Sequence, residues 1–404
     1  MKRWCMGLAL LSTLAVAAEP AYDWKLPAWV PPPVVPADNP MSEAKVELGR
    51  HLFYDRRLSL RQNQSCATCH QQARGFSDGR PLPFGSTGQR GVRNAMSLAN
   101  IAYLPVLTWA NPNLKQPEQQ ALVPLFGEHP VEMGMAGREA ELLARLRSDP
   151  HYPPLFQAAF PDGEISLATV VRAIAAFERA LLSFDSPYDR YRYGGDKNAL
   201  SAAARRGERL FFGEKMECYH CHGGINFTDN LQHSRLAFPE LGFHNTGLFN
   251  LNGQGAYPAG QQGLREFSGE AADEGKFRTP SLRNVALSAP YMHDGSIPTL
   301  AAVIRSHYAK KGMAVTRGQR ASPLRSQFIE GFRVSEREVR DLVAFLQALT
   351  DHNFVTNPRF ADPFAAGRAD RSPSAVSTAS HPLGTGTKCP STSDKGVPPC
   401  KTRL

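Results

Sequence analysis

Apolar residues recur at helical spacing in several segments of this chain. Residues 167–184 carry them at every third or fourth position, which predicts an amphipathic helix. Residues 335–350 show the same spacing, and Ser335 with Glu338 predicts a capping box where that helix begins. An alanine- and arginine-rich segment, 200–212, predicts a further helix. Alternating strand patterns are sparse, so we expect a mainly α fold with long loops.

One short pattern occurs twice. Residues 49–54 read GRHLFY and residues 207–212 read GERLFF, and each is followed by a pair of cysteines and a histidine. Repetition of a helix and its following motif indicates two related structural units. We therefore expect two domains built alike, over residues 41–195 and 196–361.

The two ends of the chain differ from its middle. Residues 1–18 combine basic residues, an apolar run and small residues, which is typical of a cleaved signal peptide; an uncleaved anchor is the alternative. Residues 19–40 are rich in proline, and we expect them to run extended over the surface. Residues 362–404 predict a disordered basic tail in which Cys389 and Cys400 form a local disulfide. We therefore expect an exported, periplasmic protein that has no membrane span after the signal is removed.

Composition excludes several classes of protein. The chain has 404 residues, 42% hydrophobic and 21% charged, with a net charge of +9. Seven cysteines are too few for a disulfide-built fold of this length. Lysines and arginines are scattered, so no nucleic-acid-binding module is indicated.

The cysteine motifs carry the strongest chemical signal. Both have the form Cys-x-x-Cys-His, in which two thiols can add to the vinyl groups of a haem and the histidine can bind its iron. A redox cysteine pair or half of a zinc site is the alternative for a single motif, but two motifs with repeated flanks favour two c-type haems. The residues concerned are Cys66, Cys69, His70, Cys218, Cys221 and His222.

The second axial ligand of each iron separates catalysis from electron transfer, because an open iron can bind peroxide. Between His70 and His129 there is no histidine, and Met96 is the one soft ligand available. We therefore expect the first haem to be open. After the second motif, residues 291–293 and 307–308 offer several ligands for the other iron.

From residue 41 to 355 the sequence resembles the bacterial dihaem cytochrome c peroxidase and MauG family. The resembling segments are LFYDRRLS at 52–59, SCATCH at 65–70, RNAMSLAN at 93–100, TWANP at 108–112, EQQALVPLFGEHPVEMG at 118–134, CYHCHGG at 218–224 and FRTPSLRNVALSAPYMHDGS at 277–296. The sequence near TWANP and PLFGEHPVEMG is most similar to that of the MbnH-like subgroup. Those enzymes are encoded with a copper-binding partner and oxidise a tryptophan on it.

This resemblance implies roles for individual residues. His70 would bind the iron that reacts with peroxide, and His222 the second iron. The distal pocket of the first haem would be formed by Gln120, Pro124 and Glu132. Glu132 would be the acid/base in peroxide cleavage. The spacer before Glu132 is longer than the family pattern, which leaves His129 as a competitor in the pocket.

Further roles follow from the same resemblance. Trp109 would relay electrons between the haems, and Tyr308 would bind the second iron where peroxidases have methionine. The spacing from Pro290 to Tyr308 is one residue longer than expected, so His307 stays an alternative. One calcium ion would be bound by Asn94, Ser288 and Pro290. Met216 stands where MauG has the tryptophan that passes oxidation to its substrate, so the exit must differ or end on an aromatic such as Tyr219.

The sequence therefore predicts an exported dihaem oxidoreductase that uses hydrogen peroxide to oxidise a partner protein, in particular a tryptophan. One alternative is a peroxide-detoxifying cytochrome c peroxidase that takes electrons from a cytochrome or a cupredoxin. Another is a dihaem electron carrier without catalysis, which would need both irons to have two axial ligands.

Overall fold

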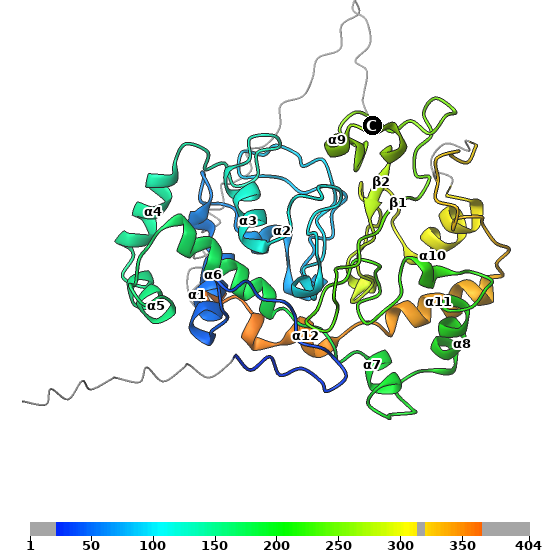
Figure 1. The fold of residues 1–404 in the computed structure, drawn as a ribbon, viewed down its shortest axis with the longest axis horizontal. Coiled ribbons are helices and arrows are strands. Elements are labelled where there is room, and N and C mark those ends of the chain that lie inside the picture. Colours follow the sequence, from blue (N-terminus) through cyan, green and yellow to red (C-terminus); the bar gives the residue numbers. More distant parts are fainter. Residues whose placement is uncertain (1–21, 313–319, 366–404) are drawn as a thin grey trace, which may run out of the picture. The chain divides into compact units, whose positions relative to one another are not determined.

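The computed structural model describes residues 22–312 and 320–365. The predicted signal peptide and the Cys389–Cys400 pair lie outside these residues and stay predictions. Within the described part the chain is mainly helical, as predicted (Figure 1). The α-helices of this part are α1 (Glu43–Tyr54), α2 (Cys66–Cys69), α3 (Pro117–Phe126), α4 (Glu139–Ser148), α5 (Tyr152–Ala159), α6 (Leu167–Ala180), α7 (Pro187–Arg192), α8 (Ala202–Phe211), α9 (Arg265–Ser268), α10 (Leu300–Ala302), α11 (Glu336–Gln347) and α12 (His352–Thr356).

Strand structure is limited to one small sheet in the described residues. β1 (Phe243–Asn245) and β2 (Lys276–Arg278) pair antiparallel, with His244 opposite Phe277. The sheet brings the segment after the second cysteine motif next to the segment that leads to Tyr308. It therefore helps to form one wall of the larger cavity described below.

The helices expected from apolar spacing are present, with shifted ends. The helix predicted over 167–184 ends at Ala180, because Leu181 leaves helical geometry at ψ 70°. The α8 helix begins at Ala202, where the Ser201 side chain accepts a hydrogen bond from the Ala204 amide. The capping box predicted for α11 is confirmed, with Ser335 and Glu338 bonded reciprocally.

The repeated sequence pattern corresponds to a repeated helix crossing. The α1 helix packs on α6, and α8 packs on α11, and the two pairs lie apart in the ribbon (Figure 1). A Cβ atom on Gly49 would lie 1.9 Å from the carbonyl oxygen of Ala173, and one on Gly207 would lie 2.0 Å from that of Asp341. Each glycine therefore permits a close helix approach that any side chain would block.

Each helix pair has its own apolar core. The first is formed by α1 and α3–α6, including Leu52 and Ile174, and the other by α8 and α11, including Phe211 and Phe345. Near its end the chain returns to the first pair, where Tyr54 donates a hydrogen bond to the carbonyl of Phe360 at 2.8 Å. The boundaries of the two predicted domains, 41–195 and 196–361, stay a prediction.

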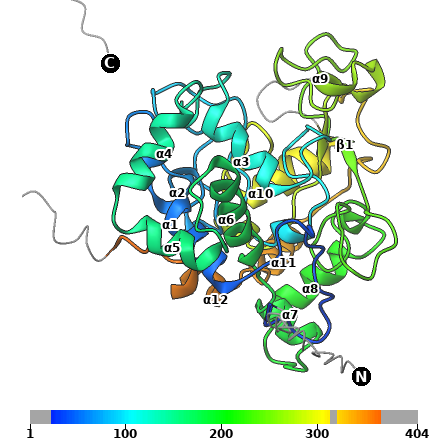
Figure 2. The ribbon, with the colours of Figure 1, turned by 60° about the vertical axis from the view of Figure 1, so that its left-hand side comes forward.

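The proline-rich segment is non-helical, as predicted, but it does not lie entirely on the surface. Val30 and Asn39 are buried, and Tyr103 donates a hydrogen bond to the carbonyl of Pro31 at 2.8 Å. In both views the segment passes close to α7 (Figures 1 and 2). Among the described residues, no helix is both long and apolar enough to cross a membrane.

Candidate functional site

The first cysteine motif lies in a cavity of about 70 Å³. It is lined by the motif itself and by residues from α3, the loop after it, and α6. The predicted site residues among its lining are Cys66, Cys69, His70, Gln120, Pro124 and Glu132. The structure thus brings together predicted residues from two separate segments of the sequence, 66–70 and 120–132.

Each motif histidine is held by a backbone carbonyl. Nδ1 of His70 lies 2.9 Å from the carbonyl oxygen of Phe76, and Nδ1 of His222 lies 3.1 Å from that of Phe227. A carbonyl can only accept, so Nδ1 is the protonated nitrogen and Nε2 is left to bind a metal. Burial lowers the pKa of both histidines, which keeps them neutral as an iron ligand requires.

The same unusual backbone geometry recurs at both sites. Phe76 has φ +62° and Phe227 has φ +51°, in the left-handed backbone region that residues other than glycine rarely adopt. This conformation turns each carbonyl toward the histidine of its motif. The predicted repeat stopped at the histidine, although Phe76-Ser77-Asp78 and Phe227-Thr228-Asp229 continue it in the sequence.

The distal wall of the first cavity is formed by α3 and the loop that follows it. Gln120 and Pro124 lie one turn apart on α3, which places both on one face. The Met133 amide donates to the carbonyl of Pro124 at 2.8 Å, and the Ser86 amide donates to that of Glu132 at 2.6 Å. The backbone at Glu132 is therefore held at its own carbonyl and at the next amide.

The environment of Glu132 alters its chemistry. Burial raises the pKa of its carboxyl above the usual range, as suits a group that exchanges protons near neutral pH. His129, the competitor left open by the longer spacer, is exposed and lies outside the lining of this cavity. The loop between them turns back at His129, so only Glu132 reaches inward.

A second carboxyl in this cavity was not expected. Glu178 on α6 is 5% exposed, and its Oε2 has no hydrogen-bond partner among the described residues. Burial raises its pKa to about 8, so the group is mostly protonated at pH 7. A signal existed in the sequence, because Glu178 lies four residues after Ile174 on the apolar face of α6.

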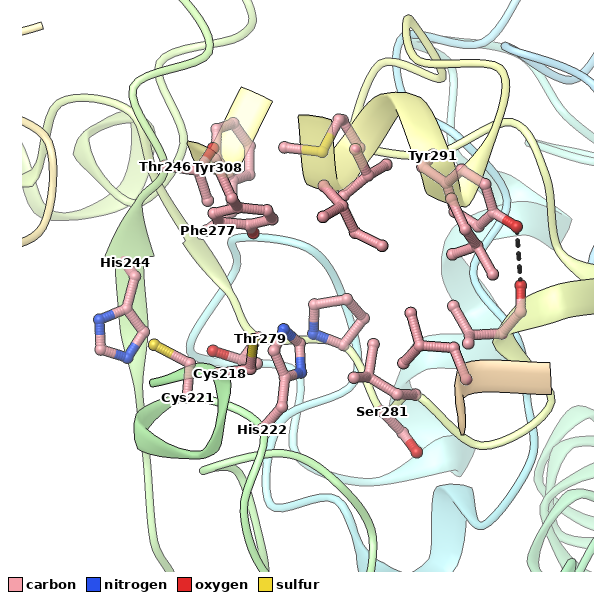
Figure 3. Close-up of a pocket in the computed structure, with 18 of the residues that line it drawn as sticks. Cys218, Cys221, His222, His244, Thr246, Phe277, Thr279, Ser281, Tyr291 and Tyr308 are labelled. Atoms are coloured by element: carbon pink, nitrogen blue, oxygen red, sulfur yellow. Dashed lines mark hydrogen bonds between the residues drawn. The ribbon is translucent and has the colours of Figure 1, made fainter. Parts of the chain in front are cut away.

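The second cysteine motif lies in a larger cavity of about 270 Å³. His222 and the two cysteines line one side, and Tyr308 lies across the space from His222 (Figure 3). The predicted residues in its lining are Asn94, Trp109, Cys218, Cys221, His222, Ser288, Pro290 and Tyr308.

Tyr308 and His307 differ in their relation to this cavity. Tyr308 lines it, whereas His307 is fully buried outside the lining. The preceding residues, Val303–His307, form a π-helical turn. A π turn accommodates one extra residue, which accounts for the longer count to Tyr308. Burial raises the pKa of the Tyr308 phenol, as expected for a phenol without a bound cation.

The other sequence candidates near the second motif, residues 291–293, also line this cavity. The Tyr291 hydroxyl donates to the carbonyl of Val285 at 3.1 Å (Figure 3). The His293 ring stacks on Phe277 with centroids 3.7 Å apart. Met96, the soft ligand considered for the first haem, lines the second cavity instead.

Trp109 and the predicted calcium residues lie on the wall of the second cavity. Trp109 Nε1 donates to the carbonyl of Asn94 at 2.8 Å, and the Arg278 amide donates to the carbonyl of Trp109 at 2.8 Å. Ser288 and Pro290 line the same cavity. These residues are thus neighbours in space, while their binding of calcium stays a prediction.

The residues of the two cavities fit haem groups. Each cavity presents the two thiols and the neutral imidazole of its cysteine motif, which is the donor set of a c-type haem site. In the second, Arg278 is buried and donates to the carbonyls of Thr108 at 3.0 Å and Thr279 at 3.4 Å. No carboxylate of the described residues pairs with this guanidinium, so it is suited to the propionate of a bound haem.

The fold and the paired cysteine–histidine sites define a protein of the dihaem c-type class. A family model described as di-haem cytochrome c peroxidase matches residues 43–198. The methylamine utilization protein MauG of Methylophilus methylotrophus is 35% identical over 84% of this chain and 93% of its own length. The cytochrome-c peroxidase IdrP1 of Denitromonas iodatirespirans is 36% identical over 85% of this chain and 92% of its own.

A solved structure extends this relationship. The crystal structure of a MauG-like protein associated with microbial copper homeostasis has a TM-score of 0.81 and 49% identity, and the match covers 85% of this chain and 100% of that one. The chain belongs to the dihaem cytochrome c peroxidase and MauG family, and it is an oxidoreductase of that family. The resemblance inferred from the sequence is confirmed.

Proposed function

We propose that this protein is exported to the periplasm and uses hydrogen peroxide to oxidise a tryptophan on a partner protein. The observation that carries the proposal is Tyr308, which faces His222 across the second cavity where a peroxidase would have methionine. A phenolate oxygen is a hard, anionic ligand that favours oxidised iron, so the second site suits storage of oxidising power. The copper-homeostasis protein of similar structure supports a small copper-binding partner.

At the first site the chain's residues handle protons and exclude water. A haem bound to His70 would supply the iron that takes up peroxide. Glu132 lines the first cavity, where desolvation raises the pKa of its carboxyl, so its carboxylate can accept the proton of an arriving peroxide and return it to the departing oxygen. Gln120, one turn before Pro124 on α3, offers an amide that can hold the peroxide in position.

At the second site the chain's residues hold and relay electrons. Tyr308 and His222, which face each other across the second cavity, would hold the second iron. Trp109 lines the same cavity and is fixed by its bond to Asn94, so we assign it the relay between the two sites. Calcium bound by Asn94, Ser288 and Pro290 would stiffen the segments that hold Trp109.

A peroxide-detoxifying peroxidase is the second candidate, because a relative named cytochrome-c peroxidase is 36% identical. It would draw electrons from a reduced cytochrome or cupredoxin. A dihaem electron carrier without catalysis would need a second axial ligand at both irons, whereas two carboxyls, of Glu132 and Glu178, line the first cavity.

The experiment adds hydrogen peroxide to the purified haem-loaded protein and then offers one of two reductants. One is a reduced monohaem c-type cytochrome, and the other is a small copper-binding protein that contains tryptophan. Our proposal predicts slow consumption of the cytochrome and oxygen-bearing tryptophan products on the copper protein by mass spectrometry. Rapid sustained oxidation of the cytochrome with an unmodified copper protein would favour detoxification.

A further inference from the structure

We propose that oxidising equivalents leave the second site through Tyr188 to the stacked surface pair Tyr193 and Trp29. This inference rests on the proposed function and names its exit residues. Met216 is buried at the position where an exit tryptophan was expected, and its thioether contributes to the apolar core. Another oxidisable path must therefore reach the surface.

The path begins at the residue that holds the proximal histidine. Phe227 accepts the bond from His222 Nδ1 at 3.1 Å through its carbonyl, and its ring lies 5.3 Å from the ring of Tyr188 between centroids. Both rings are buried, at 1% and 5% exposure. Tyr188 is thus separated from the histidine of the second haem by a single residue.

A buried ion pair fixes this contact. Arg283 Nη1 donates to Asp189 Oδ2 at 2.8 Å, and its Nε donates to the carbonyl of Ile225 at 3.0 Å. Asp189 follows Tyr188 on α7, and Ile225 lies two residues before Phe227. The pair therefore ties α7 to the loop after the haem motif and holds the two aromatic rings together.

From Tyr188 the path continues to the surface. Its ring lies 6.4 Å from the ring of Tyr193, which is 43% exposed at the end of α7. Tyr193 stacks on Trp29 with centroids 3.9 Å apart and planes 15° from parallel. Trp29 is half-buried and also contacts Phe184 edge-on at 5.6 Å. The N-terminal segment beside α7 thus supplies the last aromatic ring of the path (Figure 2).

The rival exit is Tyr219, beside Cys218. Its ring lies 4.4 Å from His220, which stacks on the exposed Phe328 at 4.7 Å. Tyr219 is itself oxidisable and partly exposed, but the rings beyond it are His220 and Phe328, and a phenylalanine is far harder to oxidise than tyrosine or tryptophan. The pair of Tyr193 and Trp29 offers two oxidisable rings in contact at the surface.

The electrons and protons balance along the proposed path. Tyr193 gives one electron inward and releases its phenolic proton to water, to which its ring is exposed. The partner's side chain then supplies one electron, and the proton returns from water. Two such transfers oxidise the partner by two electrons, the number that hydrogen peroxide accepts when it is reduced to water.

The test uses the full haem-loaded protein with hydrogen peroxide and no partner, so that unused oxidising power damages the exit residues. Peptide mapping by mass spectrometry locates oxygen-bearing adducts, and the visible spectrum follows the return to the resting state. The variants are Trp29→Phe/Tyr193→Phe, the rival Tyr219→Phe and the control Tyr191→Phe, whose ring lies on α7 next to Lys197 and outside the path. All keep an aromatic ring at each position.

We expect adducts at Trp29 and Tyr193 in the wild type and a severalfold slower return to the resting spectrum in the double variant. Tyr191→Phe and Tyr219→Phe should match the wild type. Two results would overturn the exit path while leaving the proposed function intact. One is adducts at Tyr219 together with a slower return to the resting spectrum only in Tyr219→Phe. The other is an equal rate of return in all variants. A spectrum that does not respond to peroxide would instead overturn the proposed function and the path together.

Discussion

The carbonyl oxygen of Phe76 lies 2.9 Å from Nδ1 of His70, in a backbone turn with Phe76 at φ +62°. The same arrangement joins Phe227 to His222. Each carbonyl selects the tautomer that leaves Nε2 to bind iron, and it orients the ring. The repeat is therefore a complete ligand-holding unit that extends beyond the cysteine motif itself.

Replacing Glu132 with glutamine should slow the reaction with peroxide by roughly 10²-fold or more, because the amide cannot accept the peroxide proton. Stopped-flow spectroscopy of the haem-loaded protein measures this rate. Glu128→Gln is the matched control, since Glu128 is exposed in the same loop. Equal slowing by both substitutions would exclude a specific role for Glu132.

The same rate should depend on pH through Glu132. Burial raises its pKa above the ordinary value of 4.5, and the group must be ionised to act as a base. The rate should therefore rise with pH through a pKa above 4.5 and become flat in Glu132→Gln. A rate in the wild type that is independent of pH across this range would contradict the assignment.

Tyr308→Phe should remove an axial ligand of the second haem. The low-spin ferric signal of that haem should decrease, and its midpoint potential should rise, because an anionic ligand that favours oxidised iron is lost. Electron paramagnetic resonance and redox titration measure the two effects. Tyr291→Phe is the control, since that hydroxyl lies in the same cavity but donates to a carbonyl. A change in Tyr291→Phe alone would mean that Tyr308 is not the ligand.

Glu178→Gln should stabilise the protein at high pH. The folded pKa of about 8 exceeds the ordinary 4.5, so the folded state keeps a proton that the unfolded state loses between these values. The stability of the wild type should therefore fall relative to the variant as pH rises through this window, by roughly 1–3 kcal/mol at pH 9. Denaturant unfolding at pH 5 and pH 9 measures this, with the exposed Glu164→Gln as control. An equal difference at both pH values would show that Glu178 does not titrate as described.

Gly49→Ala and Gly207→Ala should each lower the free energy of unfolding by roughly 1–3 kcal/mol, although alanine favours helix. The added Cβ would meet the carbonyl of Ala173 or Asp341 at 1.9 or 2.0 Å, and a backbone atom cannot move aside cheaply. Arg209→Ala on the exposed face of α8 is the control. Stabilisation by either glycine substitution in thermal unfolding would show that the helices are not in such close contact.

Much of the fold followed from local patterns. Apolar spacing and the Ser335–Glu338 box located α6 and α11, because burial of one helix face leaves a periodic trace in the sequence. The end of α6 was misplaced, since Leu181 is apolar and buried although its backbone is not helical. An apolar residue that packs after a helix cannot be distinguished by spacing from one within it.

Some residues of the candidate site could likewise be predicted from the sequence, and others could not. Covalent attachment motifs are contiguous and could be read directly, and the distal and axial residues came through family resemblance. Glu178 left a signal, its position on the apolar face of α6, but its place in the cavity depends on how distant segments pack. The contact of Trp29 with Tyr193 could not be predicted for the same reason. The π turn before Tyr308 also escaped prediction, since one extra residue changes a helix only locally.

The central claim is that one haem iron is open under Glu132 while the other is held between His222 and Tyr308. Electron paramagnetic resonance of the resting, haem-loaded ferric protein tests this most directly. We predict one high-spin signal from the first haem and one low-spin signal from the second. A spectrum that is entirely low-spin would show that both irons carry two protein ligands, and it would contradict the account.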